Sequence, residues 1–301
     1  MTSGPIEQNN LAAIGLMSSA MLIVPLMDII AKYLSASLPP LEITFARFFA
    51  QLILAGLAAL VLGHRSKLLG NRPVVNLLRG AILSLAVLFF FTAVKYMSVA
   101  TAISIFFVEP MILTVLAVIF LKEKIGIRRI GAIIVGLTGA LIILRPSLAE
   151  TGLVSLLPLA TATLFAIYLL MNRFYASADG LVPIQFSAGL AGSVILGFAL
   201  VTTTALDVPE ATFIMPESWQ FGLIALMGVF SYLGHGLVVL AFQRGEAGLL
   251  APLQYLEIVG ATLFGYLVFA DFPDGPTWIG IGLIVFGGLY IAQRERAQST
   301  S

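Results

Sequence analysis

Apolar stretches of about 20 residues recur along almost the whole chain, with short polar breaks between them. A helix needs roughly 20 residues to cross about 30 Å of hydrocarbon, so each stretch is long enough to span a bilayer. With 59% hydrophobic and only 10% charged residues, the chain has too little polar surface to cover a water-soluble globule. We therefore expect an all-α integral membrane protein whose solvent is mostly lipid.

Apolar runs bounded by charge, proline or glycine predict about ten transmembrane helices. They lie near 11–33, 42–62, 74–95, 99–121, 128–144, 152–173, 183–204, 218–243, 248–269 and 277–292. The weakest breaks are at 97–99 and 245–247. We divide the chain there because an undivided run would be more than twice as long as one crossing requires.

The Lys and Arg residues are distributed unevenly over the two sides that this helix order defines. With the N-terminus inside, three of the sixteen, Lys32, Lys95 and Arg145, lie toward the outside, and Arg47 lies within the second helix. The other twelve lie inside, as expected for cytoplasmic loops. We expect a bacterial inner membrane protein with both termini in the cytoplasm. The first ten residues have no basic residue, so we expect no cleaved signal peptide.

The two halves of the chain are related by a weak repeat. Residues 93–123 align with 241–271 at a constant offset of 148, which pairs Glu109 with Glu257. The loops at 64–67 and 122–124 are basic, whereas their counterparts at 206–217 and 270–274 are acidic and contain no Lys or Arg. A repeat with an odd number of spans must emerge inverted, so equivalent loops face opposite sides.

This charge reversal predicts two inverted five-helix repeats, 1–147 and 148–301, within one membrane domain. Inverted repeats favour transport, because one scaffold can open alternately to either side.

Three features of the chain resemble a known family. They are Pro39-Pro40-Leu41-Glu42 followed by Arg47, the run Phe120-Leu121-Lys122-Glu123-Lys124, and the glycine-rich fifth and tenth helices. Over essentially its full length the chain is similar to the EamA branch of the drug/metabolite transporter superfamily, and within it to YddG-like exporters of aromatic and other amino acids. The second half departs from the pattern, since Ala188 stands where a match for Arg47 would lie.

Several polar residues lie at membrane depth, where a charge costs at least about 2.5–3.5 kcal/mol. Glu109 precedes Pro110 in the fourth helix, and Glu257 follows Pro252, Gln254 and Tyr255 in the ninth. These carboxyls either line a central cavity, where they bind a cationic group or a proton, or are buried, neutral and hydrogen-bonded. Pro110, Pro252 and, in the first helix, Pro25 are expected to kink helices near that cavity.

Four other candidates for binding or coupling are less specific. His235, flanked by glycines, can bond a substrate carboxylate, relay protons or simply join two helices. Tyr168 and Asn172 share one helix face. Arg47 can attract a carboxylate.

Other helix-spaced residues have a simpler structural explanation. Asp28 and Lys32 lie four residues apart, so we expect a local ion pair. The small-residue stripes Ala132, Gly136, Ala140 and Gly189, Ser193, Gly197 are expected to be packing seams.

Enzymatic chemistry is poorly supported. The chain has no cysteine, only two histidines, and neither a His-Glu-x-x-His nor a Gly-x-Ser-x-Gly motif, so we expect no metal, cofactor or catalytic residue. A net charge of +1 implies no nucleic-acid partner. The expected partners are a small-molecule substrate and the lipid bilayer. The sequence leaves the oligomeric state open, and a monomer is compatible with it.

The leading hypothesis is an exporter of small amphipathic metabolites, among them aromatic and other amino acids, that works by alternating access. The alternative is proton-coupled efflux of cationic drugs or other toxic compounds, with Glu109 as the coupling group.

Overall fold

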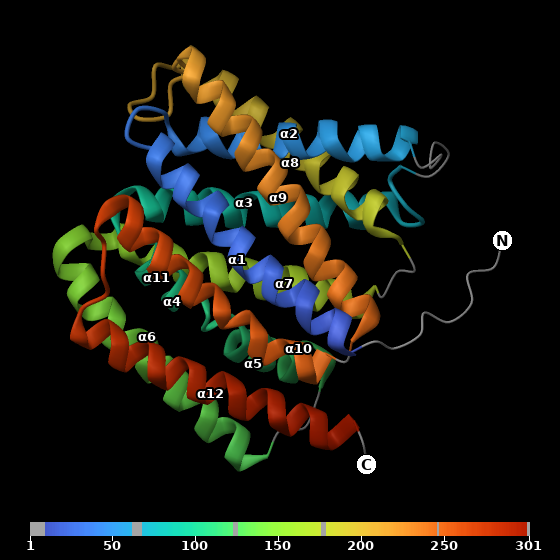
Figure 1. The fold of residues 1–301 in the computed structure, drawn as a ribbon, viewed down its shortest axis with the longest axis vertical. Coiled ribbons are helices and arrows are strands. Elements are labelled where there is room, and N and C mark those ends of the chain that lie inside the picture. Colours follow the sequence, from blue (N-terminus) through green and yellow to red (C-terminus); the bar gives the residue numbers. More distant parts are fainter. Residues whose placement is uncertain (1–9, 62–67, 123–125, 176–178, 246, 300–301) are drawn as a thin grey trace.

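The computed structural model describes residues 10–61, 68–122, 126–175, 179–245 and 247–299, and these form helices joined by short connections (Figure 1). The elements are α1 (Asn10–Leu34), α2 (Pro40–Val61), α3 (Pro73–Tyr96), α4 (Val99–Phe106), α5 (Glu109–Leu121), α6 (Ile127–Thr151), the 3₁₀ helix η1 (Gly152–Leu156), α7 (Leu157–Phe174), α8 (Leu181–Ala205), α9 (Ser218–Arg244), α10 (Ala247–Gln254), α11 (Leu256–Phe269) and α12 (Gly275–Ser299). The predicted basic clusters at 64–67 and 123–124 lie outside the described residues.

Nine helical runs among the described residues are long and apolar enough to cross a membrane. One of them, Ile130–Asn172, has 43 residues, about twice the length that one crossing requires. It consists of α6 and α7, which are joined through η1 and pack on different helices, α12 and α3. This run therefore supplies two crossings. The predicted fold class, an all-helical membrane protein with about ten spans, is confirmed.

The fourth and ninth predicted helices are each interrupted in the middle, at Phe107–Val108 and at Tyr255. Pro110 has no N–H to donate to the preceding turn, and Met111 bonds Val108 in a tighter 3₁₀ pattern at 3.0 Å. The second interruption follows Pro252 by three residues, and Tyr255 donates to the Pro252 carbonyl at 3.3 Å in the same tighter pattern. The four pieces are α4 and α5, then α10 and α11.

The fifth predicted helix extends beyond its expected end at 144, as α6 continues through Pro146 to Thr151. Hydroxyl groups support this extension: Ser147 donates to the Ile143 carbonyl at 3.0 Å and Thr151 to that of Ser147 at 2.9 Å. The proline removes one backbone bond without ending the helix, because the surrounding turns remain bonded.

The main contacts between helices are symmetric: each is repeated when the spans of the first half are replaced by the equivalent spans of the second half, and the reverse. α1 packs on α9 as α3 packs on α7, and α11 lies against α1 as α5 lies against α7. The pairs α2–α8 and α6–α12 each join two equivalent spans. The left-handed residues that end α5 and α11, Lys122 and Ala270, are also 148 positions apart. Two five-helix repeats would produce this pattern, while the exact boundary at 147/148 stays a prediction.

α1 begins and α12 ends at the same end of the bundle (Figure 1). Helix termini at this end carry Arg72, Lys122, Arg128 and Arg244, and we call it the basic end. Loops at the opposite end carry Asp207, Glu210, Glu217 and Asp271, and we call it the acidic end. Which end faces the cytoplasm stays a prediction from charge.

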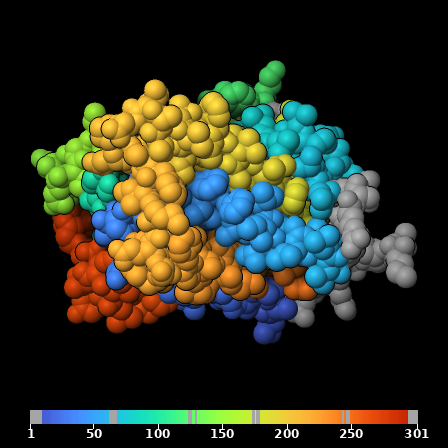
Figure 2. Space-filling view, turned by 90° about the horizontal axis from the view of Figure 1, so that it is seen from above, coloured from blue at the N-terminus to red at the C-terminus, as the bar shows by residue number. Residues whose placement is uncertain are grey.

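The outer face formed by α2, α8 and α9 is covered with side chains from all three helices (Figure 2). Large apolar residues of these helices are well exposed, among them Ile53, Leu57, Val194 and Phe198. In a membrane protein such a surface contacts lipid rather than water.

Glycines allow close backbone contact at two helix pairs. A Cβ on Gly189 of α8 would lie 2.7 Å from the Leu52 nitrogen of α2. A Cβ on Gly287 of α12 would meet the Ala132 carbonyl of α6, also at 2.7 Å. Both predicted small-residue stripes therefore contribute to packing seams.

We expect Gly280→Ala to destabilise the protein by about 1–3 kcal/mol, because the new Cβ would lie 2.6 Å from the Gly139 carbonyl across the α6–α12 seam. Gly282→Ala is the matched control on α12, where a Cβ meets nothing within 4 Å. It should be neutral or stabilise by up to about 1 kcal/mol. The free energy of unfolding in mixed detergent micelles measures both, and equal effects of the two substitutions would contradict the close contact.

Candidate functional site

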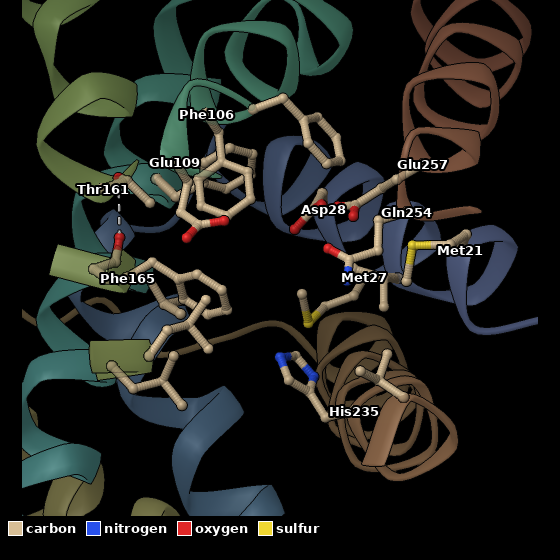
Figure 3. A pocket seen from close by; sticks show the side chains of 18 of the residues that line it. Met21, Met27, Asp28, Phe106, Glu109, Thr161, Phe165, His235, Gln254 and Glu257 are labelled. Atoms are coloured by element: carbon tan, nitrogen blue, oxygen red, sulfur yellow. Dashed lines mark hydrogen bonds between the residues drawn. The ribbon is translucent and has the colours of Figure 1, made fainter. Parts of the chain in front are cut away.

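A cavity of about 250 Å³ lies at the centre of the bundle, between α1, α3, α7, α9 and the two interrupted spans (Figure 3). Its polar lining consists of Asp28, Arg47, Glu109, Thr161, His235, Gln254 and Glu257. Its aromatic lining consists of Phe90, Phe91, Phe106, Phe107, Phe165 and Phe242. The structure therefore brings together five of the predicted site residues: Arg47, Glu109, His235, Gln254 and Glu257.

The helix interruptions place the two equivalent carboxyls. Glu109 and Glu257 each lie in the first turn of the second half-helix, α5 or α11. The N-terminal turn of a helix carries a partial positive charge, which stabilises a nearby carboxylate. The interrupting residues themselves pack together, with the Phe107 and Tyr255 rings 4.9 Å apart. Glu109 and Glu257 are 148 positions apart, and so are Phe107 and Tyr255. Equivalent residues of the two halves therefore meet at the centre of the bundle.

Three carboxyls reach the cavity from two sides. Asp28 of α1 and Glu257 of α11 point toward one another on one side, while Glu109 lies on the opposite side (Figure 3). Asp28 and Glu109 are only 3% and 7% exposed. Buried carboxylates are costly unless a proton, a cation or hydrogen bonds compensate them, so the cavity favours positively charged guests.

The expected local pair of Asp28 with Lys32 is wrong. Lys32 instead bonds the Asp271 carboxylate at 2.5 Å and the Met97 carbonyl at 3.1 Å, and it lies over the Phe269 ring. Asp28 and Lys32 are one helical turn apart, and Lys32 makes its contacts at the acidic end. Asp28 instead lines the cavity. Its signal in the sequence was the same as that of Glu109, a carboxyl at membrane depth.

Lys32 also ties three elements together at the acidic end. Its partners come from the connection after α3 and from the connection after α11, whereas Lys32 itself belongs to α1. Lys32 is about one turn from the cavity residue Asp28, so this contact lies between the cavity and the acidic end.

His235 presents a defined hydrogen-bonding edge. Its Nδ1 lies 3.0 Å from the Ser231 carbonyl of the same helix. Because a carbonyl oxygen only accepts, Nδ1 carries the hydrogen, and Nε2 of the neutral ring is an acceptor. A neutral ring would accept a hydrogen bond from a donor in the cavity, whereas a protonated ring would donate one to a carboxylate, so the role of His235 stays a prediction.

Arg47 is the one cation among the described cavity-lining residues. It is fully buried, and its Nε donates to the Met27 Sδ at 3.4 Å. Its guanidinium lies 4.3 Å from the centre of the Phe48 ring, and Nη1 has no hydrogen-bond partner.

The remaining candidates lie beside the cavity. Tyr168 and Asn172 interact with each other through their side chains and are not among the lining residues. The Tyr168 ring packs 5.5 Å from the cavity residue Phe165. Tyr255 supports the cavity through Phe107. In the described part of the chain, no three His, Cys, Asp or Glu side chains are arranged to hold a metal ion.

The three candidate hinge prolines all lie near this centre. Pro110 and Pro252 flank the interruptions, whereas Pro25 lies inside the continuous helix α1. A Cβ on Gly260 would lie 3.1 Å from Pro25, so α11 approaches α1 closely there. Hinge motion at the three prolines stays a prediction.

Comparison with known proteins agrees with this architecture. The chain is 28% identical over 271 residues to an S-adenosylmethionine uptake transporter of Rickettsia bellii, covering 89% of each chain. It is 26% identical to a riboflavin transporter of Vibrio cholerae, covering 94% of this chain and 93% of the relative. It is also 26% identical to the pseudopaline exporter CntI of Pseudomonas aeruginosa, covering 90% and 92%.

A solved crystal structure matches with a TM-score of 0.65 at 18% identity, over 96% of this chain and 99% of that chain, which shows a shared fold. The model of the EamA-like transporter family matches twice, at residues 11–145 and 152–293, as expected for a chain with an internal repeat. The chain is therefore a transporter rather than an enzyme, and it belongs to the EamA-like transporter family.

Proposed function

We propose that this chain transports small amphipathic metabolites, in particular amino acids and amino-acid derivatives that carry a positive charge and an aromatic ring. The observation that carries the proposal is the composition of the central cavity, where Asp28, Glu109 and Glu257 face a set of phenylalanines. Alternating access through the two halves of the chain would carry the cargo across the membrane.

The charges of the cavity favour a cationic cargo. Three carboxyls and one guanidinium line it, so the polar side is acidic unless protons or a guest neutralise it. Inside a low-dielectric site, an ammonium or sulfonium group gains more from such carboxylates than it would in water.

The aromatic residues favour a planar or apolar portion of the cargo. The Phe106 ring packs edge-on against both Phe90 and Phe165, with centroids 6.3 and 5.4 Å apart. This wall lies beside Glu109 (Figure 3). Rings in this arrangement accept a further aromatic group by edge or offset stacking. The cavity of about 250 Å³ is smaller than the roughly 300–1,000 Å³ of pockets for drug-sized ligands, so in this conformation it suits a single-ring amino acid better than S-adenosylmethionine or riboflavin.

The names of the relatives agree with this chemistry. S-adenosylmethionine combines an amino acid, a sulfonium cation and an adenine ring, and the relatives named for it are 26–28% identical to this chain. Riboflavin is likewise planar and aromatic. Aromatic amino acids, the expected cargo of YddG-like exporters, share the ammonium and the ring. Since the relatives are named for both uptake and export, the assay measures both directions.

A second candidate function is proton-coupled efflux of cationic drugs or other toxic compounds. The observation that favours it is Glu109, a buried carboxyl at the interruption between α4 and α5 that faces the cavity. Such a group can exchange a proton for a cationic guest as the cavity changes its accessibility.

We expect purified protein in liposomes to move labelled S-adenosylmethionine or an aromatic amino acid saturably, with counterflow, above empty liposomes. The panel comprises S-adenosylmethionine, tyrosine, phenylalanine, riboflavin and a quaternary ammonium drug. If only the drug moves, and only with a pH gradient, the second function holds. If no compound moves in either direction, the substrate proposal is wrong.

We expect Glu257→Gln to lower the apparent affinity for a cationic cargo by about ten-fold or more, because a charge-assisted bond is replaced by a neutral one. Glu150→Gln, at an exposed site on the acidic end, is the control and should leave transport unchanged. In the second function Glu109→Gln instead abolishes transport driven by a pH gradient. Initial rates over a range of cargo concentrations and pH separate these outcomes.

We also expect Asp271→Asn to loosen the acidic end, because Lys32 loses its carboxylate partner. The chain has no cysteine, so Val87→Cys places a single thiol in the cavity lining. A membrane-impermeant thiol reagent applied from the acidic end should label this thiol several-fold faster when Asp271→Asn is also present than when it is absent. Vesicles of both orientations distinguish labelling from the two ends. The control is Glu210→Gln, which removes the more exposed pair with Lys95. Equal labelling rates with and without Asp271→Asn would show that the Lys32 contact does not restrict access to the cavity.

A further inference from the structure

We propose that Arg47 binds the carboxylate of the cargo while Asp28 and Glu257 bind its cationic group, so that the cavity selects zwitterions over amines without a carboxylate. This inference rests on the proposed function, because it assumes that the central cavity carries the metabolite. It adds a positively charged binding group to the negatively charged carboxyls, and it assigns this role to Arg47 alone.

The first observation is that Arg47 is poorly satisfied. A guanidinium has five N–H donors. In the described part of the chain the hydrogen bond of Arg47 goes to Met27 Sδ, a weak acceptor, and Nη1 has no partner although the side chain is fully buried. A planar carboxylate is the group that such a fork of donors binds best, through two parallel hydrogen bonds. The site therefore lacks an anionic acceptor that a cargo can supply.

The second observation is that the opposite charges in the cavity are held apart. Asp28 interacts electrostatically with both Arg47 and Glu257. The ion pairs found among the described residues are Lys32–Asp271 and Lys95–Glu210, so Asp28 and Arg47 do not form a closed pair. The Met27 sulfur and the Phe48 ring hold the guanidinium in place. A zwitterion between the two charges would present each with its opposite.

The third observation is that Arg47 has no equivalent in the second half of the chain. Glu109 has an equivalent carboxyl in Glu257, but the position equivalent to Arg47 is occupied by Ala188, which has no polar side chain. The cavity thus has one place for an anion and carboxyls on two sides for cations. A cargo with one carboxylate and at least one cationic centre binds in a single orientation, with its ring toward the phenylalanines near Glu109.

The experiment compares each amino acid with the amine that lacks only its carboxylate. The probe pairs are tyrosine with tyramine, and S-adenosylmethionine with its decarboxylated form, in proteoliposomes. The wild-type protein should prefer the carboxylate-bearing member of the transported pair by about ten-fold or more in kcat/KM. Arg47→Met should remove this preference, mainly by raising KM for the amino acid, while the amine is still carried.

Two further variants separate recognition from folding. Arg47→Lys keeps the charge but loses the planar fork, so it should retain part of the preference. If Arg47→Met does not accumulate, Arg47→Met combined with Asp28→Asn removes both opposite charges, so neither remains buried without its counterpart. That double variant should carry the amine through Glu257 and show no preference. Lys95→Met, which removes a cation outside the cavity, is the control and should keep the wild-type ratio.

The outcomes are distinct. An undiminished preference in Arg47→Met, or in the double variant, overturns the assignment of Arg47. A wild-type protein that carries both members of a pair equally well overturns the selection of zwitterions but leaves the proposed function standing. A wild-type protein that carries neither member of any pair, and no other compound of the panel, refutes the proposed function, and this inference fails with it.

Discussion

Backbone groups inside a lipid bilayer find no water to bond with, so a membrane chain must satisfy them internally, and this constraint organises the whole molecule. It makes the spans helical and leaves irregular backbone only where protein or a cavity surrounds it. The two interruptions obey this rule. Phe107 and Val108 are 4% and 0% exposed, and Tyr255 packs on Phe107. In this fold a broken helix therefore marks the interior, and the cavity lies beside both breaks.

The charges of the site depend on the same breaks. An interrupted span creates a helix N-terminus in the middle of the membrane, where the partial positive charge of the first turn favours a carboxylate. Glu109 and Glu257 occupy those first turns. Asp28 reaches the cavity from the continuous helix α1, and Arg47 supplies the opposite charge from α2. Aromatic rings form the wall beside Glu109, so the centre combines charged groups with an apolar surface.

Much of this arrangement could be predicted from the sequence, because the bilayer makes polar residues at membrane depth rare and therefore informative. Glu109, Glu257, His235, Gln254 and Arg47 were identified on that ground, and all of them line the cavity. Asp28 was misassigned, since a lysine four residues away offered a local partner. Tyr168 and Asn172 share a helix face as predicted, but periodicity defines a face without saying which neighbour covers it.

The sequence by itself determined that the chain lies in a membrane, how many times it crosses, and that its halves are related by an offset of 148, because hydrophobic length and charge order are local properties of the chain. Only the tertiary structure decided where α4 ends and α5 begins, that Lys32 leaves Asp28 for Asp271, and which side chains share the cavity. Those outcomes depend on contacts between residues up to 239 positions apart, and no local pattern encodes which of two available partners a side chain will meet.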